Sequence, residues 1–112
     1  MAAGTYNFTL EQGSTFSRQI TVQENSTALN LTGYTARMQM RSTHDSSTIA
    51  LTFTTTIASP ASNGIVNLTA TASQSAAIEE GMYVYDLEIE SSGGVVTRLM
   101  EGKVTVTPEV TR

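Results

Sequence analysis

EEGMYVYDLEIESSGGVVTRLMEGKVTVTPEVTR, residues 79–112, decides the fold class of this chain. Its first half alternates apolar with polar side chains, which is the period of a β-strand. The apolar members of that run are Tyr83, Tyr85, Leu87 and Ile89. The Ser-Ser-Gly-Gly stretch at 91–94 supplies a turn, and a second β-rich run returns from Val95 to Val106. The stretch therefore predicts a β-hairpin.

Runs of the same period precede the hairpin. We expect strands over 6–11, 15–23, 34–41, 49–53 (fading into 54–56) and 66–70. Inward positions in the third and fourth of these runs are Tyr34, Ala36, Met38, Met40, Ile49, Leu51 and Phe53. Arg18 shares the apolar side of its strand, and we expect an edge position where its guanidinium reaches water. Asn63-Gly64 is a strong turn signal before the run at 66–70.

A short helical corner interrupts the strands. The segment SQSAAIEE, 73–80, suits one or two helical turns, with Ser73 as the cap and Gly81 following the helix end. About seven short strands with turn signals between them favour an antiparallel β-sandwich over a barrel. We therefore predict an all-β, immunoglobulin-like sandwich with one helical corner.

Length and composition fit one domain. A chain of 112 residues buries a sizeable core, so residues 1–112 are expected to form a single sandwich. Residues 1–5 and 108–112 are expected to be flexible ends, because the first has few apolar side chains and the second begins with a strand-ending proline. There is no cysteine, so core packing alone must hold the fold.

Charge argues against two classes of partner. The net charge is −4, and the six basic residues never form a run, so we expect no nucleic-acid partner. No segment approaches the length of a membrane span, and no basic leader precedes an apolar block, so we expect no membrane partner and synthesis in the cytoplasm.

Threonine is concentrated around 52–56. A β-branched, uncharged side chain suits the exposed face of a strand, so Thr52, Thr54 and Thr56 predict either a solvated face or one that packs against neighbouring copies. Both interpretations stay open. The second makes these threonines candidate interface residues.

The sequence offers no catalytic, cofactor or metal site. A relay of Ser42, His44 and Asp45 would need three side chains that a local run cannot orient. His44 and Asp45 also lack the further ligands that zinc or calcium requires. Asp86 lies outward with Glu88 and Glu90, where either an acidic stripe or an ion pair with Arg98 is expected. We therefore predict a protein that is not an enzyme and holds no cofactor.

The corner before the hairpin resembles that of immunoglobulin-like sandwiches. There a tyrosine follows an acidic and a small residue, and a core position lies two residues further on. Tyr83 would take the place of that tyrosine, and Tyr85 the position that holds cysteine in antibody domains. The chain has no cysteine and no tryptophan, so the disulfide and tryptophan of those domains are missing.

A wider resemblance covers almost the whole chain. Four blocks carry it in order: FTLEQGSTFSRQITV, LTGYTARMQMRS, GMYVYDLEIES and VVTRLMEGKVTVTPEVTR. They are similar to a family of small structural proteins of tailed bacteriophages, and in pattern to the N-terminal sandwich domains of phage baseplate proteins. The resemblance implies a virion component that acts through contacts with other virion proteins, among them copies of itself in a symmetric assembly.

The place in the virion stays open at this point. A tail, baseplate or fibre-attachment module is one expectation, a capsid decoration or cement protein is another, and a host-glycan-binding module is a third. For the first two, the tail of the chain is a further candidate interface. Its members are Pro108, Val110 as an apolar anchor and Arg112 as a charged tip.

Overall fold

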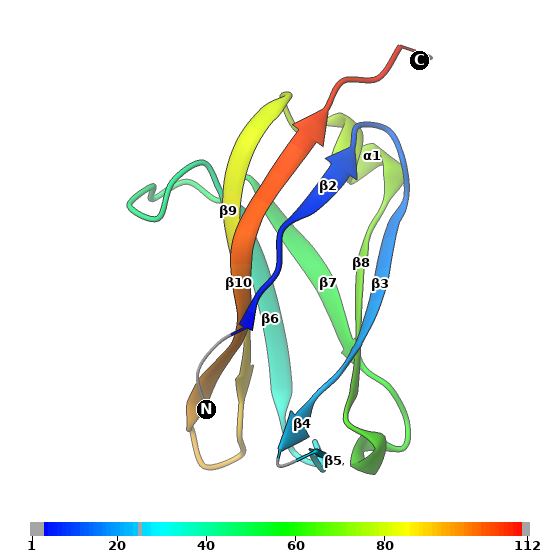
Figure 1. Cartoon of the computed structure of the whole chain (residues 1–112), viewed down its shortest axis with the longest axis vertical. Helices are drawn as coiled ribbons and strands as arrows, with labels where there is room; N and C mark the ends of the chain where they lie inside the picture. The colour runs from blue at the N-terminus through cyan, green and yellow to red at the C-terminus, as the bar shows by residue number, and fades with distance from the viewer. Residues whose placement is uncertain (1–3, 25, 111–112) are drawn as a thin grey trace.

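The computed structural model describes residues 4–24 and 26–110 (Figure 1). The protein is mainly β with one short α-helix. Its elements are β1 (Gly4–Thr5), β2 (Phe8–Glu11), β3 (Phe16–Thr21), β4 (Gln23–Glu24), β5 (Thr27–Ala28), β6 (Thr35–Arg41), β7 (Leu51–Ile57), a 3-10 turn (Ala61–Asn63), β8 (Ile65–Ala70), α1 (Ala72–Ala76), β9 (Gly81–Glu90) and β10 (Val96–Thr107). No helix among these is long and apolar enough to cross a membrane.

Within the described residues, eight strands form one strongly curled sheet in the order β1-β10-β9-β6-β7-β8-β3, with β2 also beside β10. The predicted hairpin is confirmed as β9 and β10, paired from Val96 opposite Glu90 to Val106 opposite Gly81. The sheet is mixed rather than antiparallel, because β1 and β2 run parallel to β10. Alternation predicts a strand but says nothing about the direction of its partner.

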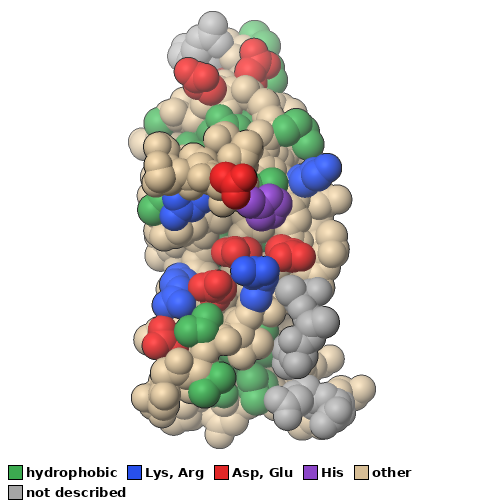
Figure 2. Space-filling view, turned by 90° about the vertical axis from the view of Figure 1, so that its left-hand side faces the viewer, with side chains coloured by type: hydrophobic (Ala, Val, Ile, Leu, Met, Phe, Trp, Pro, Cys, Tyr) green, Lys and Arg blue, Asp and Glu red, His purple; other side chains and the backbone are tan. Residues whose placement is uncertain are grey.

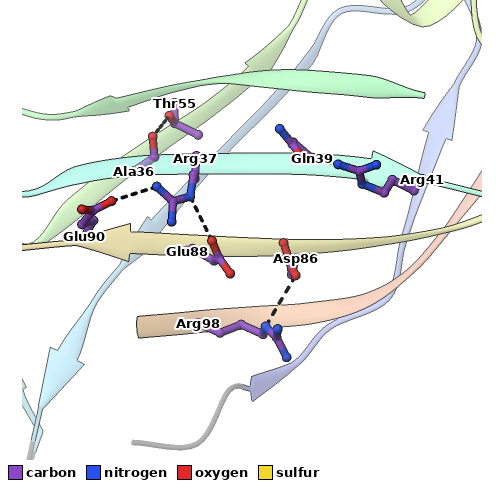
Figure 3. Close-up of polar contacts among 9 residues, drawn as sticks. All are labelled: Ala36, Arg37, Gln39, Arg41, Thr55, Asp86, Glu88, Glu90 and Arg98. Atoms are coloured by element: carbon purple, nitrogen blue, oxygen red, sulfur yellow. Dashed lines mark hydrogen bonds and ion pairs between the residues drawn. The ribbon is translucent and has the colours of Figure 1, made fainter. Parts of the chain in front are cut away.

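Strand β7 joins the two halves of the sheet. Its first residues, Leu51 to Phe53, pair with β6, and Thr54 to Ile57 pair with β8. Where β7 leaves β6, the Thr55 hydroxyl donates to the carbonyl of Ala36 at 2.7 Å (Figure 3). The β6–β7 register would place these two residues opposite each other, so the side chain replaces a lost ladder bond. The result is one continuous half-barrel, not clearly the predicted two-sheet sandwich.

The concave side of the sheet holds the core. Its fully buried members include Leu10, Leu31, Met38, Met40, Val66, Leu68, Leu87, Ile89 and Val104. The inward faces predicted for 34–41, 66–70 and 83–89 are confirmed. Ile49 is a wrong prediction, since its side chain is 42% exposed. The reason is that β7 begins at Leu51, which leaves Ile49 in the preceding loop.

The helical corner is present with a different cap. Thr71 caps α1: its hydroxyl accepts from the Gln74 N–H at 3.1 Å, and the Gln74 side chain accepts from the Thr71 N–H at 2.8 Å. This reciprocal pair is a capping box, and it places the cap two residues before the predicted one, Ser73. Gly81 is also misplaced by the sequence, because Ala77 ends the helix and Gly81 opens β9.

Residues near both ends contact the rest of the fold. Gly4 and Thr5 pair with Met100 and Glu101 of β10. Gly102 of β10 makes room for Tyr6, the residue after β1, because a Cβ at Gly102 would collide with the Tyr6 carbonyl. At the other end, the Glu109 N–H donates to Gln12 Oε1 at 3.0 Å. Residues 1–3 and 111–112, which the predicted flexible ends include, lie outside the described residues.

Candidate protein-binding groove

The curled sheet stays open along one side. Strand β3 ends the sheet order on one side, and β1 and β2 lie beyond β10 on the other. Figure 1 shows β2 and β3 leaving a common turn and diverging toward the opposite end of the molecule. Within residues 4–24 and 26–110, no strand covers the outer side of β3.

Two adjoining hollows, each of about 390 Å³, lie between these edges. We name them together the β3–β10 groove. Its walls come from β1, β2, β3, β4 and β10, and Ile20 and Met100 line both hollows. The lining residues are Gly4, Thr5, Tyr6, Phe8, Phe16, Arg18, Gln19, Ile20, Thr21, Val22, Gln23, Met38, Leu68, Leu99 and Met100. Most of the larger side chains among them are apolar, so the groove is an apolar trough.

An aromatic cluster holds the two walls together at one end. The Phe8 and Phe16 rings, from β2 and β3, lie 5.0 Å apart, and Phe8 meets the edge of Tyr85 at 4.9 Å. Tyr85 donates its phenol hydrogen to the Tyr6 carbonyl at 2.6 Å. Burial, with a smaller contribution from Tyr6, raises the pKa of the Tyr85 phenol to about 12. The groove is therefore fixed at this end and open toward β4.

Strand β3 presents backbone groups to the open side. The Val22 N–H donates to the Gly64 carbonyl at 2.6 Å, one step beyond the pair Thr21 and Ile65. Hydrogen-bonded pairs alternate along an antiparallel ladder, so the even-numbered residues of β3 bond to β8. Ser17, Gln19 and Thr21 consequently direct their N–H and C=O groups away from β8, toward the open side.

Arg18 is the only charged side chain among the described residues that line the groove. Its guanidinium lies 5.1 Å from the centre of the Phe16 ring, and its Nη1 donates to the carbonyl of Ser17 at 3.1 Å. The edge position expected for Arg18 is confirmed, since β3 ends the sheet order and the residue is exposed. No carboxylate pairs with it within the described part of the chain.

A β-bulge shapes the far wall. The register of β10 on β9 shifts between Arg98 and Met100, which leaves Leu99 as the extra residue. Leu99 and Met100 both line the groove. Two adjacent apolar residues in an otherwise alternating strand are a bulge signal, and the prediction of this strand did not use it.

The convex face of β6, β9 and β10 carries two arginines, and each of them pairs with two carboxylates. Arg37 pairs with Glu88 and Glu90, both at 2.9 Å, and Arg98 pairs with Asp86 at 3.5 Å and Glu101 at 3.2 Å. Figure 2 shows acidic and basic side chains interleaved on this side of the molecule, and Figure 3 shows both pairs of Arg37 and the pair of Arg98 with Asp86. The predicted pair of Asp86 with Arg98 is confirmed. Opposite charges on adjacent strands also favour the observed register.

Asp86 lies beside a polar hollow of about 260 Å³, which His44 and Glu101 also line. Burial raises the pKa of the Asp86 carboxyl above its ordinary value of 3.8. Glu88 and Glu101 act in the same direction, whereas Arg98 and His44 oppose it. His44 and Asp45 are exposed in the loop between β6 and β7. The described residues contain no group of three side chains suited to a metal ion.

The predicted interface residues lie in two separate places. Thr52, Thr54 and Thr56 share the exposed face of β7. Pro108 is exposed, and the side chain of Val110 is 91% exposed, both following β10. Strands β9 and β6 separate β10 from β7, so the sheet does not bring the two sets together. Arg112 lies outside the described residues.

No protein-family model matches this chain, and no curated protein matches it. The groove, the charged face and the sequence blocks are therefore the features that bear on its function.

Proposed function

We propose that this protein is a structural component of a tailed-bacteriophage virion, in the tail, baseplate or fibre-attachment apparatus, and acts through protein–protein contacts. The β3–β10 groove carries the proposal. It combines an apolar trough with a strand edge whose N–H and C=O groups have no strand partner among the described residues. Such edges are docking sites for other chains.

The sequence resemblance supports the same site. The block FTLEQGSTFSRQITV spans β2 and β3, and VVTRLMEGKVTVTPEVTR spans β10 and its bulge. These two blocks build most of the groove walls. Two of the four segments that resemble phage structural proteins are thus the ones that form the proposed docking groove.

We further propose that the curled sheet is a variant of the immunoglobulin-like sandwich. The Tyr83 phenol donates to the Glu79 carbonyl, four residues upstream, at 2.8 Å. This is the hydrogen bond of a tyrosine corner, and the sequence placed Tyr83 at that position. A strand that changes partners, as β7 does, is also how corners form in packed sheets.

The charged face supports a protein partner over a nucleic acid. Arg37 and Arg98 each engage two carboxylates, so neither guanidinium is available to phosphate without breaking an ion pair. Binding to a polyanion depends on basic groups that exchange counterions for phosphates. A face on which four carboxylates surround two guanidiniums contributes little to such binding.

The test is incorporation into particles. Gln19→Pro removes an N–H that points away from β8, so it blocks the edge and spares the internal ladder. Gln19→Ala is the matched control, because it loses the same side chain and keeps the N–H. We expect blots of purified particles to detect the wild-type, Gln19→Ala and His44→Ala proteins. The Gln19→Pro protein should be missing from the particles although it folds.

Two results would overturn the proposal: absence of the wild-type protein from particles, or normal incorporation of Gln19→Pro. Labelling the protein in particle images then assigns its place. Label on the tail or baseplate agrees with the proposal, and label spread over the capsid would support the decoration protein instead.

A further inference from the structure

We propose that the β3–β10 groove receives an extended strand of a partner protein, whose inward side chains are apolar except for one carboxylate that meets Arg18. The inference rests on the proposed function for the site. It adds the chemistry of the partner.

The backbone of β3 sets the conformation of the partner. Ser17, Gln19 and Thr21 direct N–H and C=O groups to the open side, spaced two residues apart, and the Ser17 carbonyl also accepts from Arg18 Nη1. An extended chain matches this spacing, because its own groups also alternate. The added chain would become the next strand after β3, which is β-strand addition.

The floor of the groove sets the side chains of the partner. Alternate residues of an added strand point inward, where the groove is lined by Phe8, Phe16, Ile20, Met38, Leu68 and Met100. Burying polar side chains on this floor would cost free energy without offering them hydrogen bonds. Apolar residues at alternate positions therefore fit, and those between them face outward and are free to be polar.

Arg18 selects one position. It lies on the inward side of β3 between Phe16 and Ile20, so an added strand would cover its guanidinium. A wholly apolar strand would leave this charge buried without a counter-charge, and a basic one would repel it. A carboxylate at that position forms a charge-assisted pair. Arg18 thus excludes indiscriminate apolar strands and admits an acidic one.

The same residue argues against a second copy of this chain as the occupant. A copy that offered its own β3 would bring another Arg18 into the groove, where the two like charges would repel. Its tail offers two exposed apolar side chains, Pro108 and Val110, among the described residues after β10, and the proline has no N–H to donate. A strand from a different protein, with alternating apolar residues, matches the groove better.

Synthetic peptides test the inference on the whole protein. The probe is Thr-Val-Thr-Glu-Thr-Val-Thr, and its counterparts carry Lys or Val in place of Glu. We expect the Glu peptide to protect the amides of Ser17, Gln19 and Thr21 from hydrogen exchange, measured by NMR. By titration calorimetry it should bind about tenfold more tightly than the Lys peptide, as expected for one charge-assisted pair.

Charge-reversal variants assign that preference to Arg18. Arg18→Glu should reverse the order of affinity for the Glu and Lys peptides. If the reversed charge impairs folding, Arg18→Gln is the second variant, and it should abolish the difference in affinity. Lys103→Glu is the matched control, since it reverses an exposed charge on β10 outside the groove, and should leave the order unchanged.

Three results would overturn the inference: equal affinity for the peptides, protection elsewhere in the sheet, or protection at β3 that rises with protein concentration in the absence of peptide. The last would identify a second copy as the occupant. The particle experiment is independent of these. A protein found in particles that binds no peptide refutes only the strand partner, and one that binds the Glu peptide but is missing from particles refutes the virion role.

Discussion

Single hydroxyl groups hold this fold together where the backbone ladder ends. Thr55 donates to Ala36 where β7 changes partners, and Tyr85 donates to Tyr6 where β1 gives way to β2. Ser75, fully buried, donates to the Ser14 carbonyl at 2.8 Å and ties α1 to the turn before β3. No buried side-chain nitrogen or oxygen in the described residues lacks a partner. The abundant hydroxyl residues therefore serve the interior as well as the solvated faces.

Tyr85 gives the first prediction. Tyr85→Ala removes a side chain that is 3% exposed and contacts Phe8, so the free energy of unfolding should fall by about 3 kcal/mol or more. Glu88→Ala removes a partly exposed partner of Arg37 and should cost about 0.5 kcal/mol. Urea denaturation of both variants measures the difference. Similar losses would mean that the inward and outward faces of β9 are assigned the wrong way round.

Asp86 gives a prediction about pH. Its pKa is raised in the folded protein by burial and by Glu88, so the folded state holds this proton more tightly than the unfolded state does. Its ionisation therefore removes stability as pH rises from below 3.8, the ordinary value, through the higher folded pKa. Asp86→Asn should gain stability relative to the wild type across that rise, as measured by urea denaturation at pH 3 and at pH 7. A constant difference between the two proteins would contradict the raised pKa.

At the scale of elements, the sequence predicted the strands and turns that depend on neighbouring residues alone. The β9–β10 hairpin, the inward face of β6 and the turn at Asn63-Gly64 follow from alternation and from glycine, and Gly64 does adopt a left-handed φ of 70°. Partner choice did not follow, because the parallel placement of β1 and β2 and the change of partner in β7 depend on distant strands. Hence the sheet is mixed and continuous where an antiparallel sandwich was predicted.

The start of α1 gives the prediction for this scale. Thr71→Ala removes the hydroxyl that accepts from the Gln74 N–H, so the free energy of unfolding should fall by about 1 kcal/mol. Ser73→Ala is the control, since Ser73 is exposed within the helix and caps nothing. Thermal denaturation of the two variants distinguishes the observed cap from the one that the sequence indicated. A larger loss of stability for Ser73→Ala than for Thr71→Ala would identify Ser73 as the cap, as the sequence indicated.

At the scale of the whole molecule, the groove could not be read from the sequence as a site. Its walls come from residues 4–8, 16–23 and 99–100, which only the curling of the sheet brings together. Two local signals pointed to it. Arg18 broke the apolar face of β3, and Leu99 beside Met100 broke the alternation of β10. The first departure lies on β3, which ends the sheet order, and the second lies at the bulge of β10 beside β1.

The tail after β10 gives the last prediction. Glu109 belongs to the body of the protein: its N–H donates to Gln12 Oε1 at 3.0 Å, and the Gln12 side-chain nitrogen in turn donates to the Ile78 carbonyl at 2.6 Å. Val110 does not belong to the body of the protein, since it is 91% exposed. Deleting residues 110–112 should therefore shift Tm by about 1 °C or less, whereas a deletion that also takes Glu109 should lower Tm by several degrees, since about 1 kcal/mol is lost.

The shorter deletion isolates the contact made by the tail in an assembly. If Val110 anchors the protein to a neighbouring subunit, deleting residues 110–112 should reduce incorporation into particles although Tm is preserved, and Val110→Ser should do the same. Blotting of purified particles measures this, with Thr107→Ser, a mild change inside β10, as the control. Normal incorporation of the truncated protein would rule out the tail as an anchor. The β3–β10 groove and the exposed threonines of β7 would then be the remaining candidate surfaces.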